Sequence, residues 1–132
     1  MVVLVEIKRE ALRFMLTEAR VSHPRECCGI LLGSENRIDQ AIATRNVHPN
    51  PDTHFEIDPQ ALIDAHRAAR EGGLHVAGYY HSHPAGKVAP SVTDAAMASG
   101  DGRIWAIIAD EELALWCDRK AGFMPVSYRI VD

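Results

Sequence analysis

Residues 74–94 read LHVAGYYHSHPAGKVAPSVTD, and this stretch combines a strand, a loop and the beginning of a helix. Residues 74–80 are mostly apolar and predict a central β-strand that leads directly into His81 and His83. Because side chains two residues apart on a strand project from the same face, both imidazoles face one way. The loop that follows is long enough to fold Asp94 back over the end of the strand.

His81, His83 and Asp94 form a set of ligands that suits zinc. Two imidazoles and one carboxylate match zinc coordination, whereas magnesium and calcium prefer shells made of oxygen. Catalytic zinc commonly has three protein ligands and keeps a fourth position for water. The stretch therefore predicts a zinc hydrolase with an open coordination position.

Ser91 and Asp94 also fit a pattern that needs no metal. In a Ser-x-x-Asp sequence the serine can cap the helix, while the aspartate favours the positive end of the helix dipole. Taken alone, this pair would be read as a cap. Two histidines at strand spacing, with a carboxylate in reach, favour the metal site. Ser82 projects to the opposite face of the strand, so we expect it to have a supporting structural role only.

Length and composition limit the class of protein to which the chain can belong. The chain has 132 residues and is 47% hydrophobic, which predicts a single globular domain over residues 1–132. A net charge of -4, from 14 basic and 18 acidic residues, predicts no nucleic-acid partner and no anionic membrane surface. No run of 18 apolar residues occurs, so no segment is expected to span a bilayer. The amino terminus has the pattern of a first strand and lacks that of a secretory leader.

The cysteines indicate a reducing compartment. Cys27, Cys28 and Cys117 are odd in number and two of them are adjacent, which argues against a disulfide framework. We therefore expect them to be packing residues of a cytoplasmic protein.

The remaining pattern predicts a mixed sheet with helices. Apolar residues at helical spacing follow a first strand and continue up to His23 and Pro24, and a second helix is capped by Asp58 and ended by Gly72 and Gly73. We expect an α/β (α+β) fold, a single three-layer domain with a mixed central β-sheet flanked by helices. The predicted strands are 2–7, 27–33, 37–47, 74–80, 104–109, 113–117 and 123–131; 34–36 is the turn of a hairpin, 48–53 a loop and 91–98 a short helix.

The order of these residues resembles a known family. The sequence contains a glutamate, then His-x-His-Pro, then six residues and Ser-x-x-Asp, and this order is similar to the JAMM motif of the MPN (JAB) domain zinc metalloproteases. The glutamate of this pattern is Glu26, in the stretch PRECCGILLG. The sequence FEIDP at residues 55–59 also resembles the segment that these domains carry before their second helix. Every position of the motif is filled, whereas domains of the family that have lost catalysis typically lack one. The resemblance implies an active member with an MPN fold, which is related to that of cytidine deaminases.

The resemblance implies a role for each motif residue. His81, His83 and Asp94 would bind zinc together with a water molecule. Glu26 would act as general base, taking a proton from that water and passing it to the leaving amine. Ser91 would donate a hydrogen bond to the oxyanion of the tetrahedral intermediate. From residue physics alone, Glu26 would be read as a solvated surface charge.

The resemblance also implies the class of substrate. Enzymes of this family cleave peptide or isopeptide bonds at the glycine-rich C-terminal tails of ubiquitin or ubiquitin-like proteins, and small prokaryotic members act on sulfur-carrier proteins of the same fold. Only 38 residues follow Asp94, which leaves little room for insertions that grip a second ubiquitin. We therefore expect a small prokaryotic-type member whose partner is a ubiquitin-like or sulfur-carrier protein with a Gly-Gly tail. The sequence leaves a homodimer open.

Two other classes of function compete with this interpretation. The first is a non-catalytic MPN scaffold with a vestigial metal site. The second is a zinc nucleobase or nucleoside deaminase. Such deaminases carry His-x-Glu followed by Pro-Cys-x-x-Cys, but His83 lacks the glutamate and the chain contains no Cys-x-x-Cys.

Overall fold

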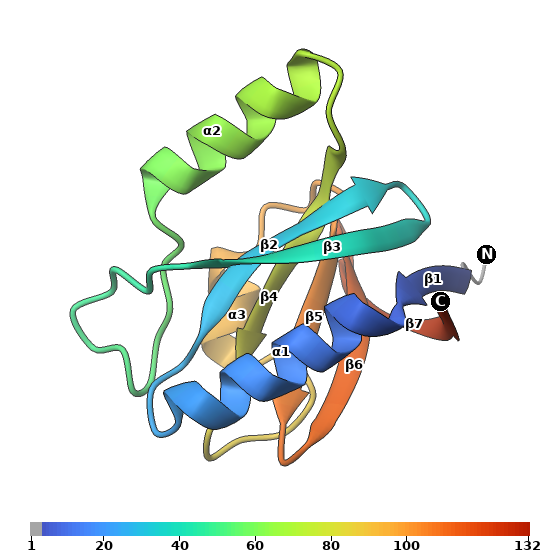
Figure 1. Cartoon of the computed structure of the whole chain (residues 1–132). Helices are drawn as coiled ribbons and strands as arrows, with labels where there is room; N and C mark the ends of the chain where they lie inside the picture. Colours follow the sequence, from blue (N-terminus) through green and yellow to red (C-terminus); the bar gives the residue numbers. More distant parts are fainter. Residues whose placement is uncertain (1–3) are drawn as a thin grey trace.

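The computed structural model describes residues 4–132, which form one α+β domain with a mixed sheet (Figure 1). The sheet is mixed because β1 pairs in parallel with β3 and β7, and β4 with β5, while the other pairs are antiparallel. The expected fold class is confirmed. The elements are β1 (Leu4–Lys8), α1 (Arg9–Ser22), β2 (Cys28–Ser34), β3 (Arg37–Thr44), α2 (Pro59–Arg70), β4 (His75–Ser82), α3 (Val92–Met97), β5 (Ile104–Ala109), β6 (Glu112–Arg119) and β7 (Gly122–Val131).

Most predicted elements appear close to their expected bounds. The hairpin of β2 and β3 is present as predicted. The second helix is also present, and the Asp58 carboxylate caps it by accepting a hydrogen bond from the Gln60 N–H. The predicted first strand is β1, and its residues Val2 and Val3 lie outside the described residues. The strand predicted for 37–47 ends earlier, at Thr44, because the chain then turns into a loop. Within residues 4–132, none of the helices is long and apolar enough to cross a membrane.

Helices pack on both sides of the sheet. Figure 1 shows α1 and α2 on opposite sides of the β2–β3 hairpin. Buried Ala11 and Met15 of α1 pack in the larger apolar cluster, which includes Tyr80. Leu62 of α2 packs in the second cluster, which includes Trp105. Alternate residues of the strands supply the two clusters, as the period of a strand requires.

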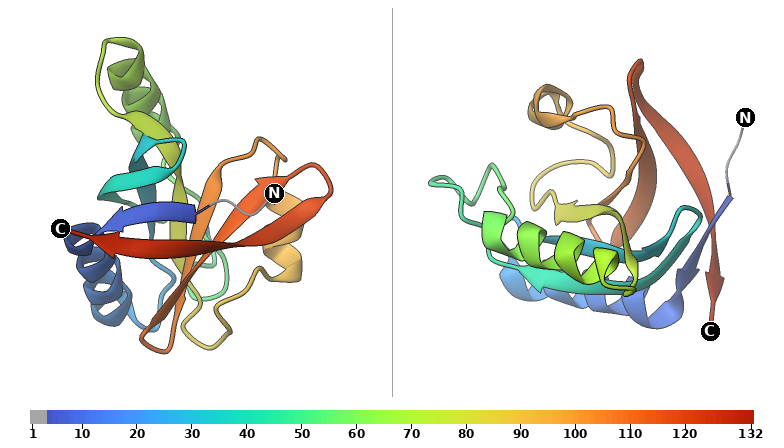
Figure 2. Two further views of the ribbon diagram at one scale, coloured as in Figure 1. Left: turned by 90° about the vertical axis from the view of Figure 1, so that its right-hand side faces the viewer. Right: turned by 90° about the horizontal axis from the view of Figure 1, so that it is seen from above.

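The sheet curls until its first and last strands meet. Around the ring the strand order is β1-β3-β2-β4-β5-β6-β7, and β7 pairs with β1 from Leu4↔Ser127 to Lys8↔Val131. Figure 2 shows these two strands side by side. Glu6 on β1 forms ion pairs with Arg37 of β3 and Arg129 of β7. Hydrophobic periodicity predicts the strands but carries no signal for this closure, because the paired residues are distant in sequence.

The register of β2 on β4 positions the residues of interest. These strands are antiparallel, with Cys28 opposite His81. Beyond this pair, the Cys27 N–H donates to Ser82 Oγ at 2.9 Å and the Ser82 N–H donates to the Cys27 carbonyl at 3.1 Å. Glu26, just before β2, therefore lies beside the chain that leaves β4.

Close approach of β4 and β5 requires a glycine at position 78. A Cβ there would lie 1.8 Å from the Ile104 carbonyl oxygen, which belongs to the paired backbone and cannot rotate away. Gly78→Ala is therefore expected to lower the free energy of unfolding by about 3 kcal/mol, measured by chemical denaturation. Ala43→Gly, at an exposed position of β3, is the control and should cost about 1 kcal/mol or less. Equal losses in the two variants would contradict the predicted contact.

Candidate metal centre

The structure brings the three predicted ligands together. His81 is the seventh residue of β4, His83 follows the strand and Asp94 lies in the first turn of α3. Their ligand atoms all lie within 4.8 Å of one another. The two imidazole Nε2 atoms are 2.9 Å apart, and each is 3.1 Å from Asp94 Oδ2. The chain thus contains a His-His-Asp site of the kind that holds a metal ion.

The spacing of these atoms fits zinc. Ligand atoms of a regular tetrahedron with zinc bonds of about 2.0–2.1 Å are about 3.3 Å apart. The triangle of 2.9, 3.1 and 3.1 Å is only a few tenths of an ångström tighter than this. Two nitrogen donors and one oxygen donor are also the chemistry that zinc accepts and that magnesium does not favour.

The helix cap and the metal site coexist at Asp94. The Asp94 N–H donates to Ser91 Oγ at 3.0 Å, and the Ser91 N–H donates to Asp94 Oδ2 at 2.9 Å, which is a complete capping box. The same Oδ2 faces both imidazoles. The helix cap predicted from the Ser-x-x-Asp pattern is therefore present, and it directs the Asp94 carboxylate toward the two histidines.

The two imidazoles are oriented by different means. His83 Nδ1 lies 2.7 Å from the Lys87 carbonyl oxygen, which makes Nδ1 the protonated nitrogen and leaves Nε2 for a metal. His81 Nδ1 is buried and has no hydrogen-bond partner among residues 4–132. Its ring instead stacks on Phe55, with centroids 4.2 Å apart, and meets the edge of Trp105. Packing therefore sets the orientation of His81.

Burial and hydrogen bonding favour the metal-binding charge states of His81 and Asp94, whereas at His83 burial is outweighed by hydrogen bonds to Asp94 and the Lys87 carbonyl, which raise its pKa. Burial lowers the pKa of His81, despite the opposing effect of Asp94, and so favours the neutral imidazole. Burial works against the ionised form of Asp94, but hydrogen bonds from the two imidazoles prevail and hold the pKa of its carboxyl well below the usual range. A neutral imidazole and a carboxylate are the forms that coordinate zinc.

Glu26 is buried beside the ligands. The residue is 7% exposed, in contrast to the solvated surface charge that residue physics alone suggests. Burial raises its pKa to about 7, and the charge of Asp94 adds to this while His83 opposes it. A carboxyl that gains and loses a proton near neutral pH is suited to general base catalysis.

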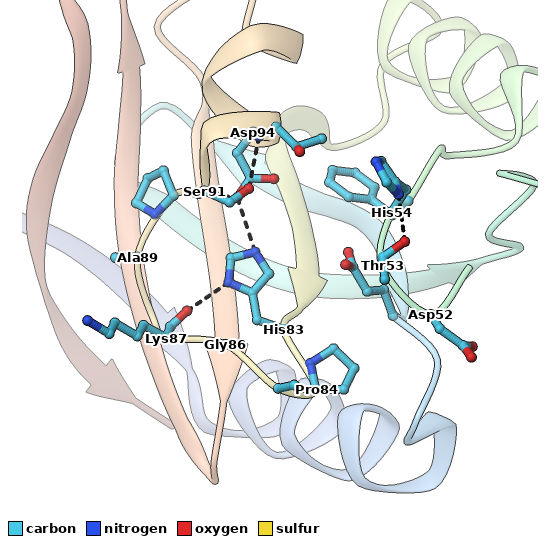
Figure 3. Close-up of a pocket in the computed structure, with 15 residues that line it drawn as sticks. Asp52, Thr53, His54, His83, Pro84, Gly86, Lys87, Ala89, Ser91 and Asp94 are labelled. Atoms are coloured by element: carbon cyan, nitrogen blue, oxygen red, sulfur yellow. Dashed lines mark hydrogen bonds and ion pairs between the residues drawn. The ribbon is translucent and has the colours of Figure 1, made fainter. Parts of the chain in front are cut away.

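A cleft of about 420 Å³ joins these groups. Figure 3 shows His83, Ser91 and Asp94 along one side of it and Asp52, Thr53 and His54 along the other, and Glu26 also lines it. Ser91 is exposed, and because its Oγ accepts from the Asp94 N–H, its own O–H remains able to donate into the cleft.

Some groups that shape the site could not be predicted from the local sequence pattern. Phe55 stacks on His81, but the sequence marks it only as the first residue of FEIDP. The Lys87 carbonyl orients His83 through main-chain atoms, which residue type does not disclose. Cys27 and Cys28 take no part: burial raises the pKa of their thiols to about 12 and about 11, so both stay protonated and unreactive.

Comparison with known proteins places this chain in a family. The model for prokaryotic homologs of the JAB domain matches residues 8–118. The chain belongs to this family. A solution structure of a protein from Desulfitobacterium hafniense, 25% identical, superimposes with a TM-score of 0.85 over 97% of this chain and 93% of that one. The prokaryotic JAB fold is thus shared by both chains.

Two curated relatives carry names that describe an activity. A desampylase from Haloferax volcanii is 32% identical over 90 residues, which are 67% of this chain and 65% of that protein. A CysO-cysteine peptidase from Mycobacterium tuberculosis is 29% identical over 128 residues, which are 96% of this chain and 82% of that protein. The match to the desampylase thus spans just under two thirds of that relative's length.

The variant Asp94→Asn distinguishes the role of Asp94 as a metal ligand from its role as a helix cap. Asparagine keeps an oxygen that can cap the helix, but it is neutral and a poor zinc ligand. Zinc affinity, measured by competition with a chromophoric chelator, is expected to fall by about 100-fold or more, because even changes outside the ligand set cost about 10- to 100-fold. Asp58→Asn, which alters the cap of α2, is the matched control and should bind zinc normally. Unchanged affinity in Asp94→Asn would leave Asp94 a cap only.

Glu26→Gln should stabilise the metal-free protein in a pH-dependent way. Because folding raises the pKa of Glu26 from about 4.5 to about 7, its ionised form costs free energy above pH 7 and nothing well below pH 4.5. In the presence of a chelator we expect the variant to gain up to about 3 kcal/mol at pH 8.5 and little near pH 5, measured by chemical denaturation. Glu56→Gln, on an exposed side chain, is the control. A gain independent of pH would refute this explanation.

Proposed function

We propose that this protein is a zinc-dependent metallopeptidase of the JAMM type. It hydrolyses a peptide or isopeptide bond at the glycine-rich C-terminal tail of a ubiquitin-like or sulfur-carrier protein. The observation that carries the proposal is the buried Glu26 carboxyl, with a pKa raised to about 7, in the same cleft as the His-His-Asp site. A ligand set alone would support metal storage or a structural ion, whereas a poised carboxyl beside it supports hydrolysis.

Each residue has a role in this proposal. His81, His83 and Asp94 hold the ion, and bound zinc supplies a water whose pKa is lowered to about 7 and a Lewis acid for the scissile carbonyl. Glu26 accepts the proton of the attacking water and returns it to the leaving amine. The Ser91 O–H donates to the oxyanion that forms as the carbonyl is attacked.

The cleft and the relatives support the class of substrate. Pro84, Ala85, Ala89 and Pro90 line the cleft together with His83, and small or rigid side chains of this kind suit a chain of glycines. The names of the relatives from Haloferax volcanii and Mycobacterium tuberculosis, a desampylase and a CysO-cysteine peptidase, point to the same kind of chemistry. Free thiols at Cys27, Cys28 and Cys117 support a place in the reducing cytoplasm.

A cleavage assay tests the function. Zinc-loaded protein is incubated with Gly-Gly-tailed carrier proteins that bear short C-terminal extensions, and the products are weighed by mass spectrometry. We expect carriers that end in Gly-Gly together with the released extensions, and we expect a chelator to stop the reaction and zinc to restore it. Glu26→Gln should keep its zinc and lose turnover by about 100-fold or more.

The same assay distinguishes the competing interpretations. If the zinc-loaded protein cleaves none of the carriers, the proposal fails in favour of a scaffold. If Glu26→Gln turns over like the wild type, Glu26 has no part in the mechanism. A zinc content near zero after native purification would point to a vestigial site.

A further inference from the structure

Asn46 lies outside the motif, yet its side chain makes several bonds beside the site. It follows β3 by two residues and is half-buried. The Nδ2 amide donates to the main-chain oxygens of Glu26 at 3.0 Å and His54 at 2.9 Å, with a longer contact of 3.5 Å to Pro51. One side chain thus joins the residue proposed as general base to a loop that lies 20 or more positions further along the chain.

The other end of the amide holds the same loop. Oδ1 of Asn46 accepts from the His48 N–H at 3.1 Å and from the Glu56 N–H at 3.0 Å. The bond to the residue two positions on is a local turn that asparagine commonly makes. The bond to Glu56, ten residues away, closes residues 47–56 into a loop, and the Val47 N–H donates to the Glu56 carbonyl at 2.9 Å in support.

This loop touches the metal site from two directions. Its Pro51 carbonyl accepts the Glu26 N–H at 2.8 Å, so both main-chain groups of Glu26 bond to the loop or to Asn46. Its Phe55 stacks on His81, the imidazole whose Nδ1 has no hydrogen-bond partner in the described part of the chain. Asn46 therefore connects the main chain of Glu26 to the loop that carries Phe55, whose ring packs on His81.

A turn residue would need only the local half of these bonds. The bond from Nδ2 to the Glu26 carbonyl spans 20 positions and adds nothing to the turn itself. Reacting groups must be held to within about 0.5 Å, and a misplacement of about 1 Å can cost about 100-fold in rate. A side chain that sets the main-chain position of a general base is placed to have such an effect.

We propose that Asn46 is a positioning residue for hydrolysis. By donating to the Glu26 carbonyl and tying down residues 47–56, it sets where the Glu26 carboxyl stands relative to the ligands and keeps Phe55 against His81. This inference rests on the proposed function of Glu26 as general base. Asn46 itself is not among the residues that line the cleft, and its side chain bonds to main-chain groups.

Two variants at position 46 test the proposal against a control on the neighbouring strand. Asn46→Asp is isosteric and keeps the Oδ1 acceptor, but it replaces the Nδ2 donor with an oxygen that faces carbonyls. Asn46→Ala removes both ends. Gln40→Ala, on an exposed side chain of β3, is the control. Zinc content, kcat and KM for a Gly-Gly-tailed carrier with a short extension are measured on each folded, zinc-loaded protein.

The expected result is a loss confined to kcat. Both variants should keep their zinc and their KM, while kcat falls by about 10- to 100-fold and Gln40→Ala behaves as the wild type. Amide hydrogen exchange of the metal-free proteins gives a second readout that does not depend on activity. In both variants the amides of residues 47–56 and of Glu26 should exchange faster, with β5 and β6 unchanged.

The outcomes separate the two proposals. A normal kcat in Asn46→Asp, with an active wild type, overturns the role of Asn46 and leaves the proposed function intact. Unchanged exchange in residues 47–56 and at Glu26 also overturns it, whatever the activity. A zinc-loaded wild type that cleaves no carrier refutes the hydrolysis itself and, with it, a positioning role in that reaction. If Asn46→Ala does not fold, the isosteric aspartate variant decides.

Discussion

The antiparallel pairing of β2 with β4 is the constraint on which the site depends. With Cys28 opposite His81, the residue that precedes β2 by two positions comes to stand beside the chain that leaves β4. Because side chains alternate between faces, a shift of one residue in this register would carry Glu26 away from the histidines. The paired bonds between Cys27 and Ser82 oppose such a shift.

The rest of the ring holds this pairing in place. β4 is bonded on both edges, to β2 and to β5, and Gly78 lets the backbone of β5 approach it closely. Closure of β1 on β7 extends strand pairing around the molecule. His81 and His83 therefore stand at the end of a central strand that is hydrogen-bonded on both edges, while α3, which carries Asp94, and residues 47–56 complete the cleft from outside the ring.

Two features of the site destabilise the folded protein when no metal is bound. The carboxyl of Glu26 is buried, and His81 Nδ1 lacks a hydrogen-bond partner within residues 4–132. Both features oppose folding of the metal-free chain. A divalent cation among the ligands would offset the like charges of Asp94 and Glu26. Such costs are typical of positions kept for chemistry.

The sequence by itself determined the elements, the caps at Asp58 and Ser91 and the convergence of His81, His83 and Asp94, because each of these depends on residues that lie near one another in the chain. A two-residue strand period and a loop of suitable length suffice to predict that His81, His83 and Asp94 converge. Only the tertiary structure decided the burial of Glu26, the ring closure and the bonds of Asn46. Each of these joins segments distant in the chain, and pairing register and packing select among such contacts where local pattern does not. Family resemblance pointed to Glu26, but the physical reason for its altered pKa, desolvation beside a charged site, exists only once the chain is folded.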